Sequence, residues 1–224
     1  MNILITGGNG FVGKSLLETL LFKKEHLVLA VVRDKKNILS SDYQLLEIKN
    51  FSEKGIWKGH LKDIDVIVHT AGRAHKFEKG SKESVKEYQK DNVIDTLSLA
   101  SEAAKAGVKR FIFLSSIKVN GEETIHGQKF KPDDIPKPED SYAISKLEAE
   151  KSLFDLSGKT KMEIVCIRPP LIYGPGVKGN LALLLKFIMK GVPLPLGSIT
   201  SNKRSFVCLL NLIDLLEVCL VHPK

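Results

Sequence analysis

The chain has 224 residues, of which 43% are hydrophobic and 27% are charged, and its formal net charge is +8. This is the composition of a globular protein with a full hydrophobic core, and it excludes disorder as the main state of the chain. No apolar run approaches the roughly 20 residues that span a bilayer, and the start lacks the features of a secretory signal, so we expect a cytoplasmic protein without a membrane span.

Short apolar runs alternate with segments of helical spacing along most of the chain. The predicted strands are Asn2–Thr6, Leu27–Val32, Val66–His69, Arg110–Ser115 and Ile164–Arg168, and the predicted helices are Lys14–Lys24, Ser81–Ala106 and Ser141–Leu156. This alternation predicts an α/β fold, here a Rossmann-type doubly wound parallel sheet covered by helices on both faces. Ligands of such sheets bind at the carboxyl ends of the strands.

The pattern changes after Pro169, where prolines and glycines become frequent. An isolated helix from about Leu181 to Lys190 and long loops predict a small cap over the sheet. We expect a last helix at Leu212–Val221, with Asn211 as its N-cap. The chain is therefore divided into residues 1–168, which form the Rossmann domain, and residues 169–224, which form a partial substrate-binding region.

A glycine-rich turn joins the first strand to the first helix. Gly7, Gly10 and Gly13 match Gly-x-x-Gly-x-x-Gly, and Gly8, Gly10 and Gly13 match Gly-x-Gly-x-x-Gly. Such a turn lets a pyrophosphate approach the backbone amides, and the helix N-terminus adds a partial positive charge. The turn therefore predicts a site for NAD or NADP.

The choice between these cofactors is usually made about 20 residues later, at the end of the second strand. Arg33 comes first there and favours the extra phosphate of NADP, whereas the adjacent Asp34 leaves NAD open. We slightly favour NADP. The competing interpretation is that Arg33 is an ordinary exposed residue at the end of a strand.

A tyrosine and a lysine are spaced for proton transfer. Tyr142 and Lys146 are four residues apart at the start of a predicted helix, and hence on one face of it. A neighbouring cation favours the phenolate and lowers the pKa of a tyrosine from about 10, so we expect Tyr142 to shuttle a proton. Ser115 and Ser116 end the preceding strand on the cofactor side, where a hydroxyl can hydrogen-bond the reacting oxygen.

Together these motifs resemble the extended short-chain dehydrogenase/reductase superfamily, and in particular its nucleotide-sugar epimerase/dehydratase branch. The resemblance covers nearly the whole chain, through the motifs Thr6–Gly13, His69–Gly72, Asp91–Val93 and Arg168–Pro175. It implies a catalytic triad of Ser116, Tyr142 and Lys146.

The resemblance also implies the binding residues. The predicted cofactor-binding residues are Gly7, Gly10, Phe11, Val12, Gly13, Arg33, Asn50, Phe51, Thr70, Ala71, Gly72, Asn92, Ser115, Tyr142, Lys146 and Pro169. The predicted substrate-binding residues are Lys118, Asn180 and Arg204, of which the last two match positions that hold the nucleotide diphosphate. A helix cap and a surface arginine are the alternative roles of Asn180 and Arg204.

Departures from the family pattern bear on the reaction. In 4,6-dehydratases a threonine followed by Asp-Glu takes the place of Ser116, and those carboxyl groups remove water; here Ile117 and Lys118 follow, so dehydration is disfavoured. The remaining groups suffice for 4-epimerisation or 4-keto reduction. The resemblance implies one of these on a nucleotide-diphosphate sugar, and specifically a UDP-(N-acetyl)hexosamine for surface polysaccharide.

Two other functions stay open. An NADPH-dependent reductase of a small carbonyl compound would use the same fold and triad, and a non-catalytic dinucleotide sensor would tend to lose Tyr142 or Lys146. Family members usually have about 300 residues or more, so we expect a truncated cap. Because two family helices, here roughly Ser81–Ala106 and Ser141–Leu156, commonly pair between subunits, we expect a homodimer.

Metal and nucleic-acid binding are not expected. His69 and His75 have no third ligand at a suitable spacing, and Cys166, Cys208 and Cys219 are predicted to be reduced thiols. The lysines are spread along the chain without interleaved aromatic residues, so a diphosphate ligand explains the positive charge better than nucleic acid does.

Overall fold

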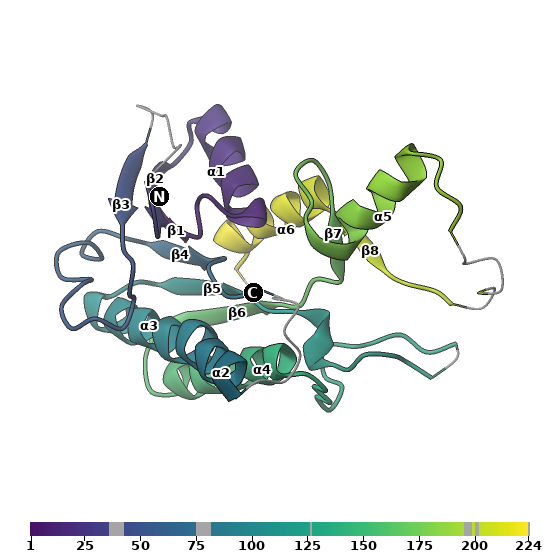
Figure 1. Ribbon diagram of the computed structural model, residues 1–224. Coiled ribbons are helices and arrows are strands. Elements are labelled where there is room, and N and C mark those ends of the chain that lie inside the picture. Colours follow the sequence, from purple (N-terminus) through teal and green to yellow (C-terminus); the bar gives the residue numbers. More distant parts are fainter. Residues whose placement is uncertain (36–42, 75–81, 126, 195–198, 200–201, 224) are drawn as a thin grey trace.

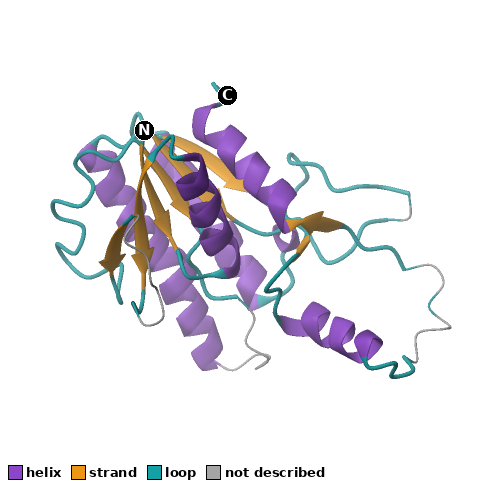
Figure 2. Cartoon of the chain, turned by 90° about the horizontal axis from the view of Figure 1, so that it is seen from above, coloured by secondary structure: helices purple, strands orange, loops and turns teal. Residues whose placement is uncertain are grey.

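The computed structural model describes residues 1–35, 43–74, 82–125, 127–194, 199 and 202–223. Within these residues, six strands form a parallel sheet in the order β3-β2-β1-β4-β5-β6 (Figures 1 and 2). The strands are β1 (Asn2–Thr6), β2 (Leu27–Val32), β3 (Gln44–Glu47), β4 (Val66–His69), β5 (Arg110–Leu114) and β6 (Glu163–Ile167). This order reverses between β1 and β4, as in Rossmann folds, so the predicted fold class is confirmed.

Helices cover both faces of the sheet because successive strand residues point to opposite sides (Figure 1). Ile3 and Ile5 pack against α1 (Phe11–Lys23) and α6 (Leu209–Val221). Leu4, between them, belongs to the other core cluster, which includes residues of α3 (Asp95–Ala106) and α4 (Ser141–Ser157). The near-continuous apolar strands are therefore buried on both faces, as predicted.

Three elements differ from the sequence-based expectation. The long helix predicted at 81–106 consists of α2 (Lys82–Tyr88), a π-helical segment η1 (Gln89–Ile94) and α3. Such π-helical turns are rare in proteins, and those that occur are often found at functional sites. The short strand β3 was not predicted. The N-cap of α6 is Cys208 and not Asn211, because the helix begins three residues earlier than its apolar spacing suggested.

The cap region contains β7 (Leu171–Tyr173), α5 (Gly179–Met189) and β8 (Phe206–Cys208), with β7 and β8 paired in parallel. No residue of α5, all of which are described, is buried. Helix α6 also lies within residues 169–224, and it packs in the same core as α1. The division at residue 168 as a whole stays a prediction.

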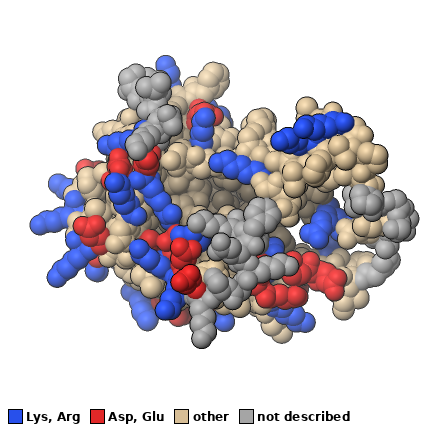
Figure 3. Space-filling model, in the orientation of Figure 1, with Lys and Arg blue, Asp and Glu red and all other residues tan. Residues whose placement is uncertain are grey.

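The charged side chains are spread over the surface, as expected from the scattered lysines of the sequence (Figure 3). Figure 3 shows basic and acidic side chains interspersed over much of the face that it displays. Among the described residues, no helix is both long enough and apolar enough to cross a membrane.

His69 is a buried structural residue that links three elements. Its Nδ1 lies 2.8 Å from the Thr6 hydroxyl on β1, and its Nε2 lies 2.9 Å from the Thr96 hydroxyl on α3. The described residues contain no group of three or more side chains that could hold a metal ion, and His75 lies outside them. Burial lowers the pKa of His69 to about 3, so the ring is neutral at neutral pH.

This histidine predicts a loss of stability in acid. Between a pH of about 6.5 and about 3, the imidazole of His69 is protonated in the unfolded protein but neutral in the folded protein. The free energy of unfolding should therefore fall by about 1.4 kcal/mol for each pH unit below about 6.5. In urea unfolding near neutral pH and near pH 4, His69→Gln should remove this part of the loss. His60→Gln, at an exposed histidine, is the control and should keep the loss. Equal acid sensitivity of the wild type and His69→Gln would contradict the prediction.

Candidate active site

The glycine turn fits a dinucleotide pyrophosphate. Gly7 has a φ of +71°, which side chains disfavour, and a Cβ on Gly13 would collide with the Gly7 carbonyl oxygen. The Gly10 amide donates to that same oxygen at 2.7 Å, and α1 begins at the next residue without a side-chain cap. The N-terminus of α1 therefore opens onto a tight, side-chain-free turn at the carboxyl end of β1, as anion binding requires.

The end of β4 is fastened to this turn. The Thr70 hydroxyl donates to the Thr6 carbonyl at 2.7 Å, and the Ala71 amide donates to the Thr6 hydroxyl at 3.2 Å. A Cβ on Gly72 would lie 3.1 Å from Asn92 Oδ1 and 3.3 Å from Lys146 Nζ. The structure thus brings the predicted residues of β1, β4, η1 and α4 together at one edge of the sheet.

Ser116, Tyr142 and Lys146 meet at the same edge. Ser116 caps the short 3-10 helix η2 (Ile117–Val119), and its hydroxyl hydrogen-bonds Tyr142 in the first turn of α4. Lys146, one helical turn later, donates to the Leu114 carbonyl at 2.9 Å, and its ammonium lies 4.5 Å from the centre of the Phe113 ring. The segment after β5 and the first turns of α4 therefore bring a hydroxyl, a phenol and an amine to the same edge of the sheet.

The pKa values in this group differ from the sequence-based expectation. Burial raises the pKa of Tyr142 to about 12, and the hydrogen bond with Ser116 opposes this only in part. The charge of Lys118 also opposes the rise, whereas the ammonium of Lys146 donates to the Leu114 carbonyl and lies over the Phe113 ring. Burial also lowers the pKa of Lys146 to about 8. The pKa of Tyr142 is therefore raised, whereas its spacing from Lys146 in the sequence led us to expect a lowered one.

Asn92 connects the end of β4 to the helix that carries Tyr142. Its Oδ1 accepts from the Arg73 amide at 2.8 Å, and its Nδ2 donates to the Arg73 carbonyl at 3.2 Å and to the Ser145 hydroxyl at 2.9 Å. Asn92 is 1% exposed and lies in η1. This position fits the supporting role that the sequence predicts for it, and it shows why η1 matters to the site.

Lys118 forms an ion-paired group next to Tyr142. Its ammonium lies 2.7 Å from Glu122 Oε1 and 2.8 Å from Asp140 Oδ2. Although burial alone would lower the pKa of Lys118, its hydrogen bonds with Asp140 and Glu122 raise it. Asp140 is also the N-cap of α4, where its Oδ1 accepts from the Ala143 amide at 2.7 Å. Asp140 was not among the predicted residues, although an Asp just before a predicted helix is a known capping signal.

The other predicted cofactor-binding residues lie in varied surroundings. Phe51 is buried, with its ring edge-on to Trp57, and Asn50 Oδ1 accepts from the Ser52 hydroxyl at 2.9 Å. Phe11 lies at the start of α1, whereas the Val12 side chain is part of the core, so only the backbone of Val12 is available to a ligand.

Two further predicted residues lie near η2. The Ser115 hydroxyl is buried and has no hydrogen-bond partner among the described residues. Pro169 accepts at its carbonyl from the Ile117 amide at 3.0 Å. An unpaired buried hydroxyl at this edge leaves a polar group for a ligand to satisfy.

The predicted diphosphate-binding residues lie on the cap. Asn180 is exposed on α5, and Arg204 is exposed shortly before β8. Arg33 is found in an ion pair with Asp91, 3.2 Å apart, which the sequence did not predict.

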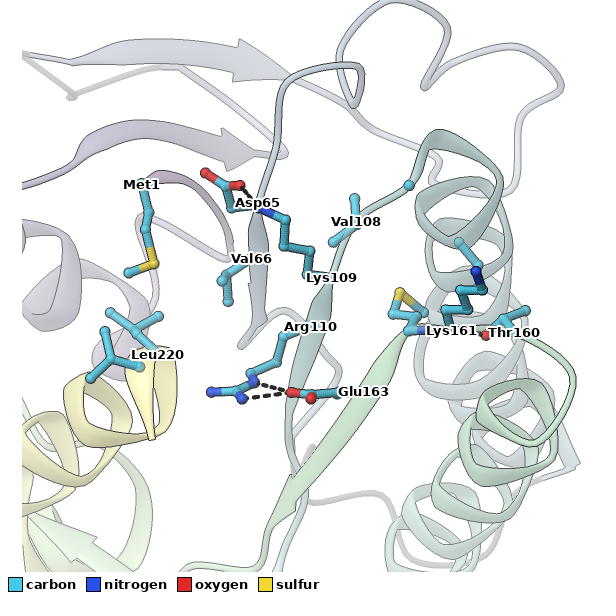
Figure 4. Close-up of a pocket in the computed structure, with 14 residues that line it drawn as sticks. Met1, Asp65, Val66, Val108, Lys109, Arg110, Thr160, Lys161, Glu163 and Leu220 are labelled. Atoms are coloured by element: carbon cyan, nitrogen blue, oxygen red, sulfur yellow. Dashed lines mark hydrogen bonds and ion pairs between the residues drawn. The ribbon is translucent and has the colours of Figure 1, made fainter. Parts of the chain in front are cut away.

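A cavity of about 1000 Å³ lies at the opposite edge of the sheet, away from these groups (Figure 4). Its lining includes the start of β4, β5 and β6 and the end of α6. Four of its charged residues form two pairs, with Lys109 Nζ 2.8 Å from Asp65 Oδ1 and Arg110 Nε 2.8 Å from Glu163 Oε2. It contains none of the predicted catalytic residues.

Comparisons with known proteins agree with this geometry. A family model described as the NAD dependent epimerase/dehydratase family matches residues 3–224. A Vibrio cholerae protein named UDP-glucose 4-epimerase is 46% identical over 223 residues, which cover 100% of this chain and 67% of that protein. An Escherichia coli O157:H7 protein, N-acetyl-alpha-D-glucosaminyl-diphospho-ditrans,octacis-undecaprenol 4-epimerase, is 30% identical over 221 residues, 96% of this chain and 62% of that protein.

The fold is also similar to that of a solved structure. The UDP-glucuronic acid 4-epimerase of Bacillus cereus, in complex with UDP-glucuronic acid and NAD, superposes with a TM-score of 0.86 at 25% identity, over 100% of this chain and 74% of that one. The chain spans about two thirds of the length of the two curated relatives. The chain belongs to the NAD dependent epimerase/dehydratase family, as its motifs predicted.

Proposed function

We propose that the chain carries the cofactor-binding and catalytic part of a nucleotide-sugar 4-epimerase that acts on a UDP-(N-acetyl)hexosamine. The observation that supports this most is the hydrogen bond between Ser116 and Tyr142 at the sheet edge that also holds the glycine turn. Family membership and the 46% identity to a UDP-glucose 4-epimerase support the substrate class.

A nicotinamide dinucleotide, when bound, would accept a hydride from C4 of the sugar and later return it. As a phenolate, Tyr142 takes the proton of the 4-hydroxyl, so that the O–H electron pair forms the carbonyl bond as the C4–H bond breaks. Ser116 hydrogen-bonds the same oxygen and keeps it in line with Tyr142. When the keto sugar has turned over and regains the hydride on its other face, Tyr142 gives the proton back, and the configuration at C4 is inverted.

The groups beside Tyr142 do not favour dehydration. Elimination of water needs a carboxyl group that can donate a proton to the leaving hydroxyl. The described position after Ile117 is Lys118, and the nearby carboxylates Glu122 and Asp140 are ion-paired with it. A 4-keto reductase would use the same Ser116 and Tyr142, so these two activities must be distinguished by the products of the reaction.

The test is incubation of the 224-residue chain with UDP-N-acetylglucosamine or UDP-glucose and a catalytic amount of NAD. The expected result is the C4-inverted sugar with no net reduction of the dinucleotide. Stoichiometric consumption of NADPH with a 4-keto sugar would instead identify a reductase. Because the chain spans about two thirds of its relatives, calorimetric binding of NAD and UDP is measured alongside. Dinucleotide binding without UDP binding would favour the small-carbonyl reductase or the sensor.

Three broader expectations belong to the same proposal. They are a cytoplasmic location, a role in surface polysaccharide synthesis and a homodimer. Ile144 and Phe154 on α4 and Ile94 on η1 are exposed apolar residues, which suits helix pairing between subunits. Sedimentation of the chain as a monomer at all working concentrations would contradict the dimer.

A further inference from the structure

Two arginines share one carboxylate beside the glycine turn. Arg33 directly follows β2, whose Val31 carbonyl accepts from the Gly8 amide at 3.2 Å, so Arg33 lies where the adenosine ribose of a dinucleotide is expected. Its NH2 donates to Asp91 Oδ2 at 3.2 Å. The side chain of Asp91 is 10% exposed and that of Arg33 is 51% exposed. A mostly buried carboxylate therefore holds an otherwise accessible guanidinium.

Asp91 is also held by a second arginine. Nε of Arg73 donates to the same Oδ2 at 3.1 Å, and NH1 of Arg73 lies 3.1 Å from Glu87 Oε2. The backbone of Arg73 is fixed by Asn92 on both its amide and its carbonyl. Asp91 therefore keeps Arg73 as a partner whether or not Arg33 moves, and its carboxylate lies beside the expected ribose position.

On the basis of the proposed dinucleotide function, we infer that Asp91 is a specificity-determining residue that makes this site select NAD over NADP. An arginine without a carboxylate partner would bind the 2′-phosphate of NADP through charge-assisted hydrogen bonds. Here the phosphate must displace Asp91 from Arg33 or lie next to it as a like charge, and either costs affinity. The neutral ribose hydroxyls of NAD avoid this cost. Arg33 alone therefore does not make an NADP site, in contrast to the preference that the sequence suggested.

The test is calorimetric titration of wild type and Asp91→Asn with NAD, NADP and adenosine 2′,5′-bisphosphate. Asp91→Asn keeps the shape of the side chain and removes its charge. NADP and the bisphosphate should bind about tenfold more tightly to Asp91→Asn, because like-charge contacts and charged hydrogen bonds have effects of at least this size. The affinity for NAD should stay within about twofold, since NAD has no 2′-phosphate.

Two further variants isolate the cause. Arg33→Gln combined with Asp91→Asn should lose the gain for NADP, because the guanidinium that receives the phosphate is gone. Glu87→Gln removes the other carboxylate on Arg73 without touching Arg33, and it should leave the preference between NAD and NADP as in wild type.

The inference is overturned if wild type binds NADP more tightly than NAD, or if Asp91→Asn leaves the ratio of the two affinities unchanged. If circular dichroism shows that Asp91→Asn does not fold, Arg73→Gln is measured instead, and its expected effect has the opposite sign. It leaves Arg33 as the arginine paired with Asp91, so NADP binding should weaken relative to NAD, and an unchanged ratio overturns the inference. If wild type binds neither dinucleotide, the proposed function itself fails, which is a different result from dinucleotide binding without discrimination.

Discussion

Replacing Tyr142 by phenylalanine should lower 4-epimerase turnover by about a thousandfold, which is within the usual contribution of a general acid–base group. The half-buried ring stays in place edge-on to Tyr88, but the hydroxyl that exchanges the proton and hydrogen-bonds Ser116 is lost. NAD affinity should stay within about twofold, because the binding turn on β1 and α1 is unchanged. Turnover is measured by the formation of C4-inverted nucleotide sugar, and NAD affinity by calorimetry.

Tyr173→Phe is the matched control for this change. Tyr173 lies on β7 with a 46% exposed side chain, and its ring packs edge-on to Phe206. Removing its hydroxyl should leave turnover within about twofold of wild type, since surface substitutions outside a site usually have small effects. A Tyr142→Phe variant that turns over as fast as Tyr173→Phe would show that the proton is exchanged by another group.

The pKa of Tyr142 adds a condition to this mechanism. With a pKa of about 12, the phenol is protonated at neutral pH and is ready to donate, but as a base it is poorly matched to the working pH. In the oxidising direction the site must therefore lower this pKa when substrate and cofactor bind. A positive charge near the phenol would have this effect, and Lys146 lies one helical turn after Tyr142 on α4.

The parts of the site that the sequence predicts are those with local spacing. The glycine turn follows from three residues between one strand and one helix. Tyr142 and Lys146 share a face because they are four residues apart on α4. The apolar runs of β1 and β4 predict buried parallel strands, and their shared edge then brings these motifs together.

The parts that the sequence did not predict depend on contacts between distant segments. β3 lacks alternation and β-branched residues, and it pairs only with β2. The π-helical turn η1 has the same apolar spacing as the helices around it, so nothing in the periodicity marks it. The pairing of Arg33 with Asp91 joins residues 58 positions apart, and this long-range contact changes how Arg33 is interpreted.

A second large effect is expected at the ion pair under the catalytic helix. Glu150 on α4 is 2% exposed and accepts from Arg168 Nε at 2.9 Å, and Arg168 NH1 also donates to Asn120 at 3.1 Å. Glu150→Gln should lower the free energy of unfolding by about 3 kcal/mol, because it leaves a mostly buried guanidinium without its counter-charge. Urea unfolding of the variant and wild type measures the difference.

Glu150→Gln should also disturb the active site, because Arg168 connects α4 to the segment after Ser116. Asn120 follows η2, and the carbonyl of Pro169, next to Arg168, accepts from the Ile117 amide at 3.0 Å. Glu102→Gln is the control, since it makes the same change in an exposed i, i+3 pair with Lys105 and should cost less than about 0.5 kcal/mol. Equal stability losses in the two variants would mean that the buried pair contributes no more than a surface one. The position of Ser116 would then depend on backbone hydrogen bonds, from the Ser115 amide to the Ile167 carbonyl and from the Ile117 amide to the Pro169 carbonyl.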